Sequence, residues 1–330
     1  MPSPKIVFAV EVGQAYGLGH MMRCRVLAGE LSRRGCRIAL AVRGDLTVLD
    51  RWPWPPGSIA SGLGATAESA AADVLSLVQD DCPDWLVVDG YGLAGTALLP
   101  ELRRRGIRTL AFDDAAEAPV PADLILNQNR LDGAPYGADA KTLLGPRFAL
   151  VAEEYRLERR VFDEPTRIRH VLVSFGGSDR KGMTLQVLRA LARTSPDFDQ
   201  IDIVAGPFHA ELQADLAANL PVRYHQAPSS LALLIAGADA VISAAGSGCW
   251  EVCCVGKPLI ALQTAENQRH VIATLRHSGA AVTLERFDED MFMAAWGRIR
   301  DVSVRRRLAI SARALVDGMG AARIADALGC

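Results

Sequence analysis

The segment "GQAYGLGHMMRC", residues 13–24, places His20 between a glycine-bearing loop and the start of a helical pattern. Gly17 and Gly19 carry no side chains, so they allow a ligand to come close to the histidine ring. The positive end of a helix disfavours imidazolium, and the sequence therefore predicts a lowered pKa for His20 and a neutral ring near pH 7. Such a ring can act as a general base. A histidine that only packs or caps is the alternative that this local pattern leaves open.

Polar residues follow three further apolar runs in the first half of the chain, "VVDGYG", "FDD" and "LNQN". Any one of these residues could simply satisfy the backbone of a loop. Three such groups in series favour a polar site built from carboxylates, amides and a phenol. Its candidate members are Asp89, Tyr91, Asp113, Asp114, Asn127 and Asn129.

The segment "SFGGSDRKG", residues 174–182, ends an apolar run and opens a helical one. The backbone N–H groups of Gly176, Gly177 and Ser178 could bind an anion such as a diphosphate at the helix end. The segment matches neither GxxxxGK[ST] nor GxGxxG. An ordinary tight turn between a strand and a helix explains it equally simply.

Two later segments also place polar residues between an apolar run and the start of a helical pattern. In "SAAGSGCWE", Ser247 lies in the loop and Glu251 lies one turn into the helix, where its carboxylate can accept two hydrogen bonds from a ribose diol. Glu251 could instead only complement the helix dipole. In "QTAENQ", Asn267 and Gln268 stand at a helix start, where Asn267 is a candidate ligand contact or an N-cap.

These segments need a scaffold, and the chain supplies a regular one. Short apolar runs alternate with helical patterns, which predicts an α/β protein with parallel sheets covered on both faces. The alternation lapses between residues 131 and 168 and then resumes. We therefore expect a Rossmann-like domain at 1–150, a linker at 151–164 and a second Rossmann-like domain with a helical tail at 165–330. Ligands of such sheets bind beyond the carboxyl ends of the strands, so we expect the two domains to face a cleft.

Composition narrows the class of ligand. The net charge of −2, from 36 basic and 38 acidic residues, gives no broad attraction for nucleic acid or an anionic membrane. The longest apolar stretch is interrupted by Asp239 and by glycines, so no membrane insertion is expected. Seven cysteines without a CxxC pair favour buried thiols in a reducing cytoplasm, and the spacing of the cysteines and histidines predicts no metal site. A small polar ligand fits best.

The motifs "GLGHMMRCRVLA", "VVDGYG", "LILNQN", "VSFGGSD" and "ISAAGSGCWEVCCVGKPLIALQTAENQ" together resemble one family. This is the UDP-2,4-diacetamido-2,4,6-trideoxy-β-L-altropyranose hydrolase family of bacterial pseudaminic acid synthesis, in the GT-B superfamily. The resemblance implies a GT-B fold and attack of water on the anomeric carbon, which releases UDP without metal or cofactor. Gly90 is a departure, since family members often have histidine there.

The resemblance also assigns roles to individual residues. It places His20 as the catalytic histidine. The residues expected to contact the sugar are Gly17, Gly19, Arg23, Asp89, Tyr91 and Asn129. The residues expected to bind the nucleotide are Gly176, Gly177, Ser178, Ser247, Glu251, Asn267 and Gln268.

Other functions share parts of this pattern. A GT-B glycosyltransferase would pass the sugar from a UDP-sugar donor to an acceptor hydroxyl, but no amphipathic, basic-rimmed stretch for a membrane-lipid acceptor is evident. A related nucleotide-linked amino sugar is an alternative substrate. A binding subunit would not need His20, and a dehydrogenase would need the missing dinucleotide fingerprint. We therefore expect a cytoplasmic hydrolase whose partners are the UDP-sugar and other enzymes of the same sugar pathway.

Overall fold

The computed structural model describes residues 3–13, 16–80, 82–133, 136, 140–159, 165–177, 179, 181–194, 198–206 and 220–330. The chain forms two compact units. The first comprises Met1–Leu150 together with Met319–Cys330, and the second comprises Val151–Gly318.

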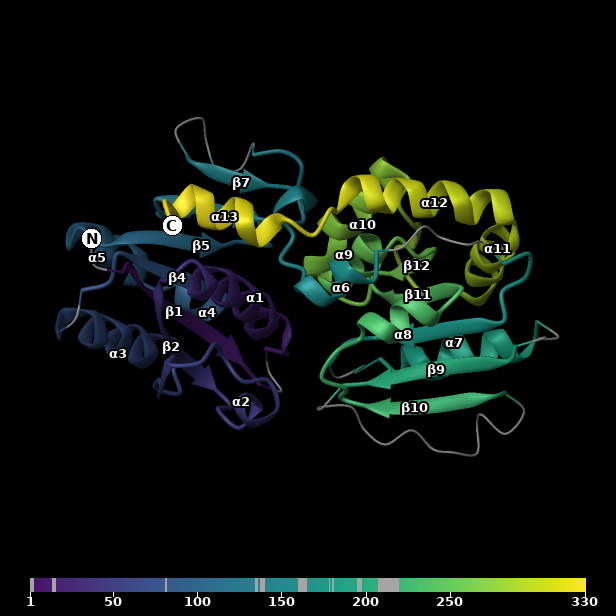
Figure 1. Ribbon diagram of the computed structural model, residues 1–330, viewed down its shortest axis with the longest axis horizontal. Coiled ribbons are helices and arrows are strands. Elements are labelled where there is room, and N and C mark those ends of the chain that lie inside the picture. The colour runs from purple at the N-terminus through teal and green to yellow at the C-terminus, as the bar shows by residue number, and fades with distance from the viewer. Residues whose placement is uncertain are drawn as a thin grey trace. The chain divides into compact units, whose positions relative to one another are not determined.

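The first unit is built on a seven-stranded parallel sheet of order β3-β2-β1-β4-β5-β6-β7 (Figure 1). Central strands β1 and β4 are buried along almost their whole length, because helices cover both faces of the sheet. Phe8 of β1 pairs in register with Leu40 of β2 and Val87 of β4. The strands are β1 (Lys5–Val12), β2 (Arg37–Gly44), β3 (Ile59–Gly62), β4 (Trp85–Asp89), β5 (Arg108–Phe112), β6 (Leu124–Asn127) and β7 (Thr142–Leu144).

The helices of the first unit connect these strands. Helices α3, α4 and α5 contribute to one apolar core with β1, β4 and β5. The described helices are α1 (Gly19–Arg33), α2 (Val48–Arg51), α3 (Ala67–Asp80), α4 (Tyr91–Ala94), α5 (Leu98–Arg104), the 3-10 turn η2 (Pro146–Phe148) and α13 (Gly320–Leu328).

The last helix, α13, packs in the first unit, whereas the sequence analysis assigned residues 319–330 to the second domain. Arg34, just after α1, donates to the Asp326 carboxylate at 2.6 Å, and Trp85 donates to the Leu328 carbonyl at 3.0 Å. A Cβ at Gly320 would lie 2.2 Å from the Ala149 carbonyl oxygen, so α13 approaches the chain too closely for any side chain there. These contacts join residues far apart in the sequence, and periodicity alone does not reveal them.

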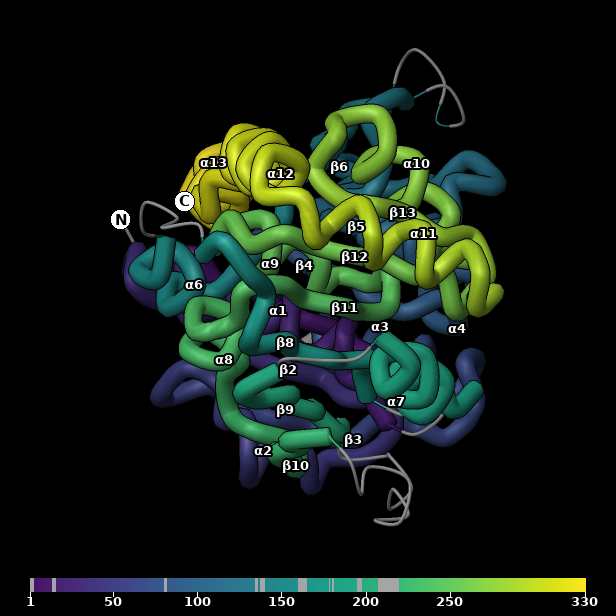
Figure 2. The backbone as a smooth tube through the Cα atoms, turned by 90° about the vertical axis from the view of Figure 1, so that its right-hand side faces the viewer, coloured from purple at the N-terminus to yellow at the C-terminus, as the bar shows by residue number. Residues whose placement is uncertain are grey.

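The second unit is a six-stranded parallel sheet of order β10-β9-β8-β11-β12-β13 (Figure 2). In Figure 2, α7 and α11 lie on one side of this sheet, and their apolar side chains form one core with the strands. The strands are β8 (His170–Ser174), β9 (Gln200–Ala205), β10 (Val222–Gln226), β11 (Ala240–Ala244), β12 (Leu259–Leu262) and β13 (Val282–Leu284). The helices are α6 (Glu153–Leu157), α7 (Met183–Ala192), α8 (Ala232–Gly237), α9 (Gly248–Val255), η4 (Glu266–Gln268), α10 (Arg269–Ser278), α11 (Glu289–Arg300) and α12 (Val302–Leu315).

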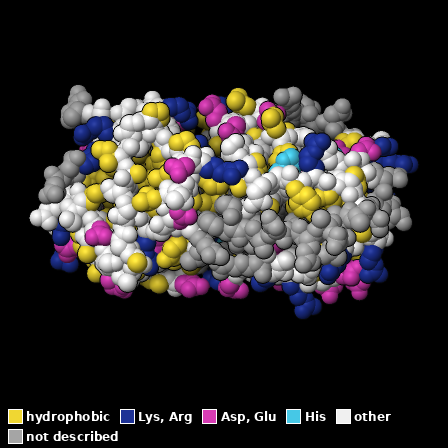
Figure 3. All heavy atoms as spheres, turned by 90° about the horizontal axis from the view of Figure 1, so that it is seen from below, with side chains coloured by type: hydrophobic (Ala, Val, Ile, Leu, Met, Phe, Trp, Pro, Cys, Tyr) yellow, Lys and Arg dark blue, Asp and Glu magenta, His cyan; other side chains and the backbone are white. Residues whose placement is uncertain are grey.

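The expected linker includes α6, which packs on α9 inside the second unit. Residues 160–164 of that linker lie outside the described residues. None of the helices in the described ranges is both long and apolar enough to cross a membrane. On the face in Figure 3, basic and acidic side chains are interspersed over the coloured atoms, with no broad field of one sign there.

The packing of α13 gives a stability prediction. We expect Gly320→Val to weaken the packing of α13 and to destabilise the first unit by about 1–3 kcal/mol, because the new side chain meets backbone at Ala149. Thermal unfolding followed by circular dichroism measures the effect. Gly297→Ala is the control, since a Cβ at Gly297 in α11 meets no heavy atom within 4 Å. Equal midpoints for both variants would contradict the predicted role of Gly320.

Candidate active site

His20, the second residue of α1, forms a buried pair with Asp89 at the end of β4. The His20 Nδ1 atom lies 2.6 Å from Asp89 Oδ1. An ionised carboxylate can only accept, so Nδ1 is the nitrogen that carries a proton in this hydrogen bond, and Nε2 is the ring nitrogen left to accept one. The ring of Tyr91 lies edge-on to His20, with centroids 5.3 Å apart. This arrangement is the one that a histidine base requires.

Arg23, one turn further along α1, joins two carboxylates that come from different strand ends. Its guanidinium donates to both oxygens of Asp89, at 2.6 Å each, and to both oxygens of Asp114, at 2.9 and 2.8 Å. Arg23 is 6% exposed and Asp89 is 1% exposed. Burial alone would raise the pKa of Asp89, but Arg23 and His20 outweigh it and hold this pKa well below its ordinary value. Asp89 is therefore ionised wherever the protein is folded near neutral pH.

Asp114 gathers the remaining members of the cluster. Asn129 donates to Asp114 Oδ1 at 2.7 Å, and the Tyr91 hydroxyl lies 3.3 Å from Asp114 Oδ2. Tyr91 is 44% exposed, so its ring lies at the accessible side of an otherwise buried cluster. The structure thus brings together His20, Arg23, Asp89, Tyr91, Asp114 and Asn129.

Two other candidates shape loops instead. Asn127 Oδ1 accepts from the backbone N–H of Asn129 at 3.0 Å. Asp113 Oδ1 accepts from the N–H groups of the two residues that end its own turn, Ala115 and Ala116, at 3.1 and 3.0 Å. These residues position Asn129 and Asp114 without joining the ion pairs, as the loop alternative in the sequence analysis held.

The glycines before His20 form a tight turn. Gly17 has a φ of +80° and bonds back to Gly13, and a Cβ on Gly17 would meet no heavy atom of the described residues within 4 Å. Gly19 is exposed as the first residue of α1. Both positions therefore border open space in the first unit, next to the residue proposed as base.

Sequence reasoning missed a second buried pair, formed by Glu11 and Arg43. Glu11 is fully buried in β1, pairs with Arg43 of β2 and accepts from the Gly92 N–H at 3.0 Å. A Cβ at Gly90 would lie 2.5 Å from Glu11 Cγ. Glu11 thus fills the space that a histidine at position 90 would need, which explains why this chain has glycine at that position of "DGYG". The only sequence signal was one glutamate inside an apolar strand.

In the second unit, Gly176 and Gly177 follow β8 as expected. Gly176 has a φ of +78°, and a Cβ at Gly206 would lie 2.4 Å from Gly177 Cα, so two loops meet there at backbone distance. Asp179 caps α7 by accepting from Met183 N at 2.8 Å and Thr184 N at 2.9 Å. The positive end of α7 is therefore partly occupied by the protein's own carboxylate. Ser178 lies outside the described residues.

Ser247 and Glu251 lie where the sequence placed them, before and inside α9. Glu251 is half-buried next to Tyr155 of α6. Burial raises the pKa of Glu251 to about 7, with Glu154 adding to the rise and the Tyr155 hydroxyl opposing it. The Tyr155 hydroxyl also accepts from Leu231 N at 3.4 Å. Glu251 can therefore change its protonation state near neutral pH.

The last candidate pair lies in η4. Gln268 Oε1 accepts from Thr264 N at 2.7 Å, so this side chain folds back onto its own loop. Asn267 lies inside η4, and Gln268, not Asn267, precedes α10 as its N-cap residue. Within the described ranges, no group of three or more His, Cys, Asp or Glu residues is arranged to hold a metal ion.

Comparison of sequences finds distant relatives. No family model matches the chain. It is 25% identical over 285 residues to the uncharacterized protein MJ1062 of Methanocaldococcus jannaschii, which covers 80% of this chain and 57% of that protein. It is 28% identical over 191 residues to the spore coat polysaccharide biosynthesis protein SpsG of Bacillus subtilis, which covers 55% of this chain and 54% of that protein. The chain spans little more than half the length of these curated relatives.

Solved structures establish the fold. The Acinetobacter baumannii MurG structure matches with a TM-score of 0.70 and 16% identity, over 99% of both chains. The calicheamicin glycosyltransferase CalG4 matches with a TM-score of 0.70 and 17% identity, over 100% of this chain and 98% of that one. The chain therefore has the α/β fold of the GT-B glycosyltransferases. These likenesses, at 16 and 17% identity, show the fold.

The Arg23 cluster gives a prediction about stability. Arg23→Ala leaves two buried carboxylates without their cation, and we expect a loss of about 3–5 kcal/mol in the free energy of unfolding. Arg33→Ala is the control on the same helix, because the Arg33 side chain is 61% exposed in its pair with Glu30, and such a pair is worth about 1 kcal/mol or less. Urea titrations of both variants measure the difference. If the two variants unfold at the same urea concentration, Arg23 does not stabilise the cluster of buried carboxylates.

Proposed function

We propose that this protein hydrolyses a nucleotide-activated amino sugar, UDP-2,4-diacetamido-2,4,6-trideoxy-β-L-altropyranose, in pseudaminic acid synthesis. The observation that carries the proposal is the buried His20–Asp89 pair, which presents Nε2 as an acceptor beside two glycines and an accessible tyrosine. The motif order of the chain supports the choice of sugar. The polysaccharide role in the printed name of the Bacillus subtilis relative agrees with sugar chemistry in general.

In the proposed reaction, His20 Nε2 takes a proton from a water molecule as the water oxygen bonds to the anomeric carbon. The bond from that carbon to the diphosphate oxygen breaks, and its electron pair leaves with UDP, so the configuration inverts. Asp89 accepts from Nδ1–H and stabilises the imidazolium that forms, which is the role of the carboxylate in His–Asp pairs. Arg23, Tyr91 and Asn129 would orient the sugar, directly or through Asp114.

The second unit would hold the nucleotide. Backbone N–H groups of Gly176 and Gly177 are the candidate donors to the diphosphate, since Asp179 already caps the first N–H groups of α7. Ser247 and Asn267 are further candidate contacts. Gln268 would act by holding its loop, and Glu251 would accept from the ribose hydroxyls.

A UDP-sugar-dependent glycosyltransferase is the second candidate, and the fold of MurG and CalG4 favours it. The same His20 would then take the proton of an acceptor hydroxyl. A panel of UDP-, GDP- and CMP-linked amino sugars, incubated with and without acceptor alcohols, separates the two functions. Nucleoside diphosphate released in water alone supports hydrolysis, whereas strict dependence on an acceptor supports transfer. Tight binding of a nucleotide-linked sugar without release of the nucleotide would indicate that the protein only binds the sugar, for example together with other enzymes of the pathway.

His20→Asn tests the proposed base. We expect turnover to fall by about 100-fold or more, because the variant cannot accept the proton, while UDP binds with unchanged affinity. Chromatographic measurement of UDP release and calorimetric titration with UDP report the two quantities. Wild-type turnover in the variant would refute the assignment, and joint loss of turnover and UDP binding would indicate a structural role instead.

Glu251 gives a pH prediction. Ribose hydroxyls donate to the ionised carboxylate, so UDP affinity should rise as pH increases through about 7, the pKa of Glu251 in the free protein. In Glu251→Gln this rise should shrink to the part that comes from the UDP phosphate, whose pKa is about 6. Calorimetry between about pH 6 and 8, with 2′-deoxy-UDP as the control ligand, separates the two contributions. A wild-type pH profile in the variant would remove Glu251 from ribose binding.

The same shift predicts stability. The pKa of Glu251 in the folded state is raised from 4.5 to about 7. The contribution of Glu251 to the free energy of unfolding is therefore largest below pH 4.5 and is lost as the pH rises through 7. Relative to wild type, Glu251→Gln should therefore gain stability on going from acidic to slightly alkaline pH. Thermal unfolding of both proteins across this range is the measurement. A difference that does not change with pH would contradict the raised pKa.

A further inference from the structure

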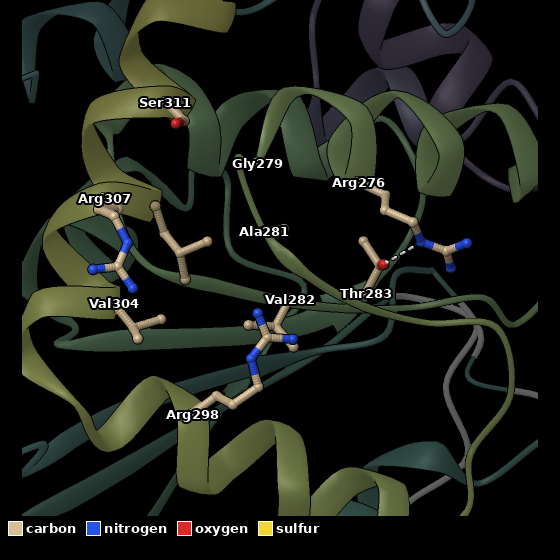
Figure 4. A pocket seen from close by; sticks show the side chains of 10 residues that line it. Arg276, Gly279, Ala281, Val282, Thr283, Arg298, Val304, Arg307 and Ser311 are labelled. Atoms are coloured by element: carbon tan, nitrogen blue, oxygen red, sulfur yellow. Dashed lines mark hydrogen bonds between the residues drawn. The ribbon is translucent and has the colours of Figure 1, made fainter.

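A cavity of about 460 Å³ opens at the outer edge of β13, the last strand of the second sheet (Figure 4). Val282 belongs to the core on the α11 side of the sheet, and its neighbour Thr283 points to the opposite side. Both residues line the cavity, so it runs along the sheet edge, where the backbone of β13 has no neighbouring strand on that side. The cavity shares no residue with the candidate active site.

Three arginines from three different helices line this cavity. Arg276 comes from the end of α10, Arg298 from α11 and Arg307 from α12. In Figure 4, the side chain of Arg298 extends from α11 to Val282, and the side chain of Arg307 lies along α12 with its guanidinium near Val304. Three arginines around one cavity concentrate positive charge there, in a protein whose net charge is −2.

The acidic side chains nearby neutralise only part of this charge. Glu285 pairs with Arg276 at 2.8 Å, and both side chains are more than half exposed, so the pair is weak. Asp301 uses its carboxylate to cap α12 at Ser303 N, 2.7 Å away. Arg307 donates to the Ser303 hydroxyl at 3.4 Å, and its charge is one of the smaller causes that lower the pKa of Asp301. In the described part of the chain, no carboxylate lies within ion-pair distance of Arg298 or Arg307.

The floor of the cavity is apolar. Val304 and Leu308 lie one helical turn apart on α12 and, with Val282, line the cavity beneath the arginines. Ser311, one turn further along α12, adds a hydroxyl to the wall. A fully hydrated inorganic ion would leave this apolar surface uncovered, whereas a ligand with a charged head and an apolar body would use both.

We propose that this cavity is a binding site for a small organic phosphate, with the phosphate between Arg298 and Arg307 and the apolar body over Val282, Val304 and Leu308. Guanidinium groups match phosphate oxygens in charge and in paired hydrogen-bond geometry. The volume lies within the range of small-ligand sites, roughly 300–1,000 Å³. Such a site gives the second unit a place for a ligand that is not the UDP-sugar.

Phenyl phosphate is the probe, because it joins a dianion to an apolar ring. Calorimetry at low salt should detect its binding to wild type, and Arg298→Ala/Arg307→Ala should weaken it by at least about tenfold. Arg300→Ala/Arg306→Ala is the matched control, since it removes the same charge from the same two helices at exposed positions that do not line the cavity. The control should bind as wild type does.

Three results would overturn the proposal. The first is absence of binding up to about 10 mM probe. The second is equal loss in both double variants, which would show only a general effect of charge. The third is tighter binding of inorganic phosphate or of a hexaglutamate peptide than of phenyl phosphate, which would indicate a bare anion site or a peptide-docking edge. Val304→Ser should lower the affinity for phenyl phosphate and leave that for inorganic phosphate unchanged, and any other result contradicts the apolar part of the site.

Discussion

The buried guanidinium of Arg23 is the interaction on which the candidate active site depends. Asp89 and Asp114 both lie in the interior, where an unpaired carboxylate would be expensive or would take up a proton. Arg23 bonds all four of their oxygens, so both carboxylates keep their charge and their orientation. One cation between two anions leaves an excess negative charge beside His20.

The parallel sheet explains why these groups meet. Asp89 ends β4, Asp114 follows β5 and Asn129 follows β6, and these three strands are neighbours in the order of the sheet. Carboxyl ends of parallel strands share one edge, so residues 15 to 91 positions apart in the chain come into hydrogen-bond contact. Helix α1 then brings His20 and Arg23 to that edge one turn apart. The cluster is thus a consequence of strand order and of two polar residues at helical spacing.

The sequence contained the alternation that defines both sheets. It also contained Asp89, Tyr91, Asp114 and Asn129 as polar residues after apolar runs, and His20 and Arg23 at the start of a helical pattern. It did not contain the pairings. Glu11 opposite Gly90, and Asp179 as the cap of α7, depend on backbone positions that only the folded chain provides. The return of α13 to the first unit depends on Arg34 and on the bare backbone of Gly320, neither of which has a local periodic signal. The local sequence pattern predicts the helices and strands and the polar residues at their ends. Ion pairs and close contacts between backbone segments determine which partner each of these polar residues has.

The pKa of a buried carboxyl group is shifted in opposite directions in the two units. In the first, burial and ion pairing hold the pKa of Asp89 far below neutral pH, so the acceptor that orients His20 keeps its charge as conditions change. In the second, burial raises the pKa of Glu251 to about 7, because no cation of the described residues compensates for it and Tyr155 offers only a neutral hydroxyl. A pair that must orient a base needs a fixed charge. A carboxyl group that binds ligand hydroxyls can be neutral in the free protein. When the ligand binds, its hydroxyl groups donate hydrogen bonds that favour the ionised form. The uncompensated burial of Glu251 is therefore consistent with a binding role in the same way that the compensated burial of Asp89 is consistent with catalysis.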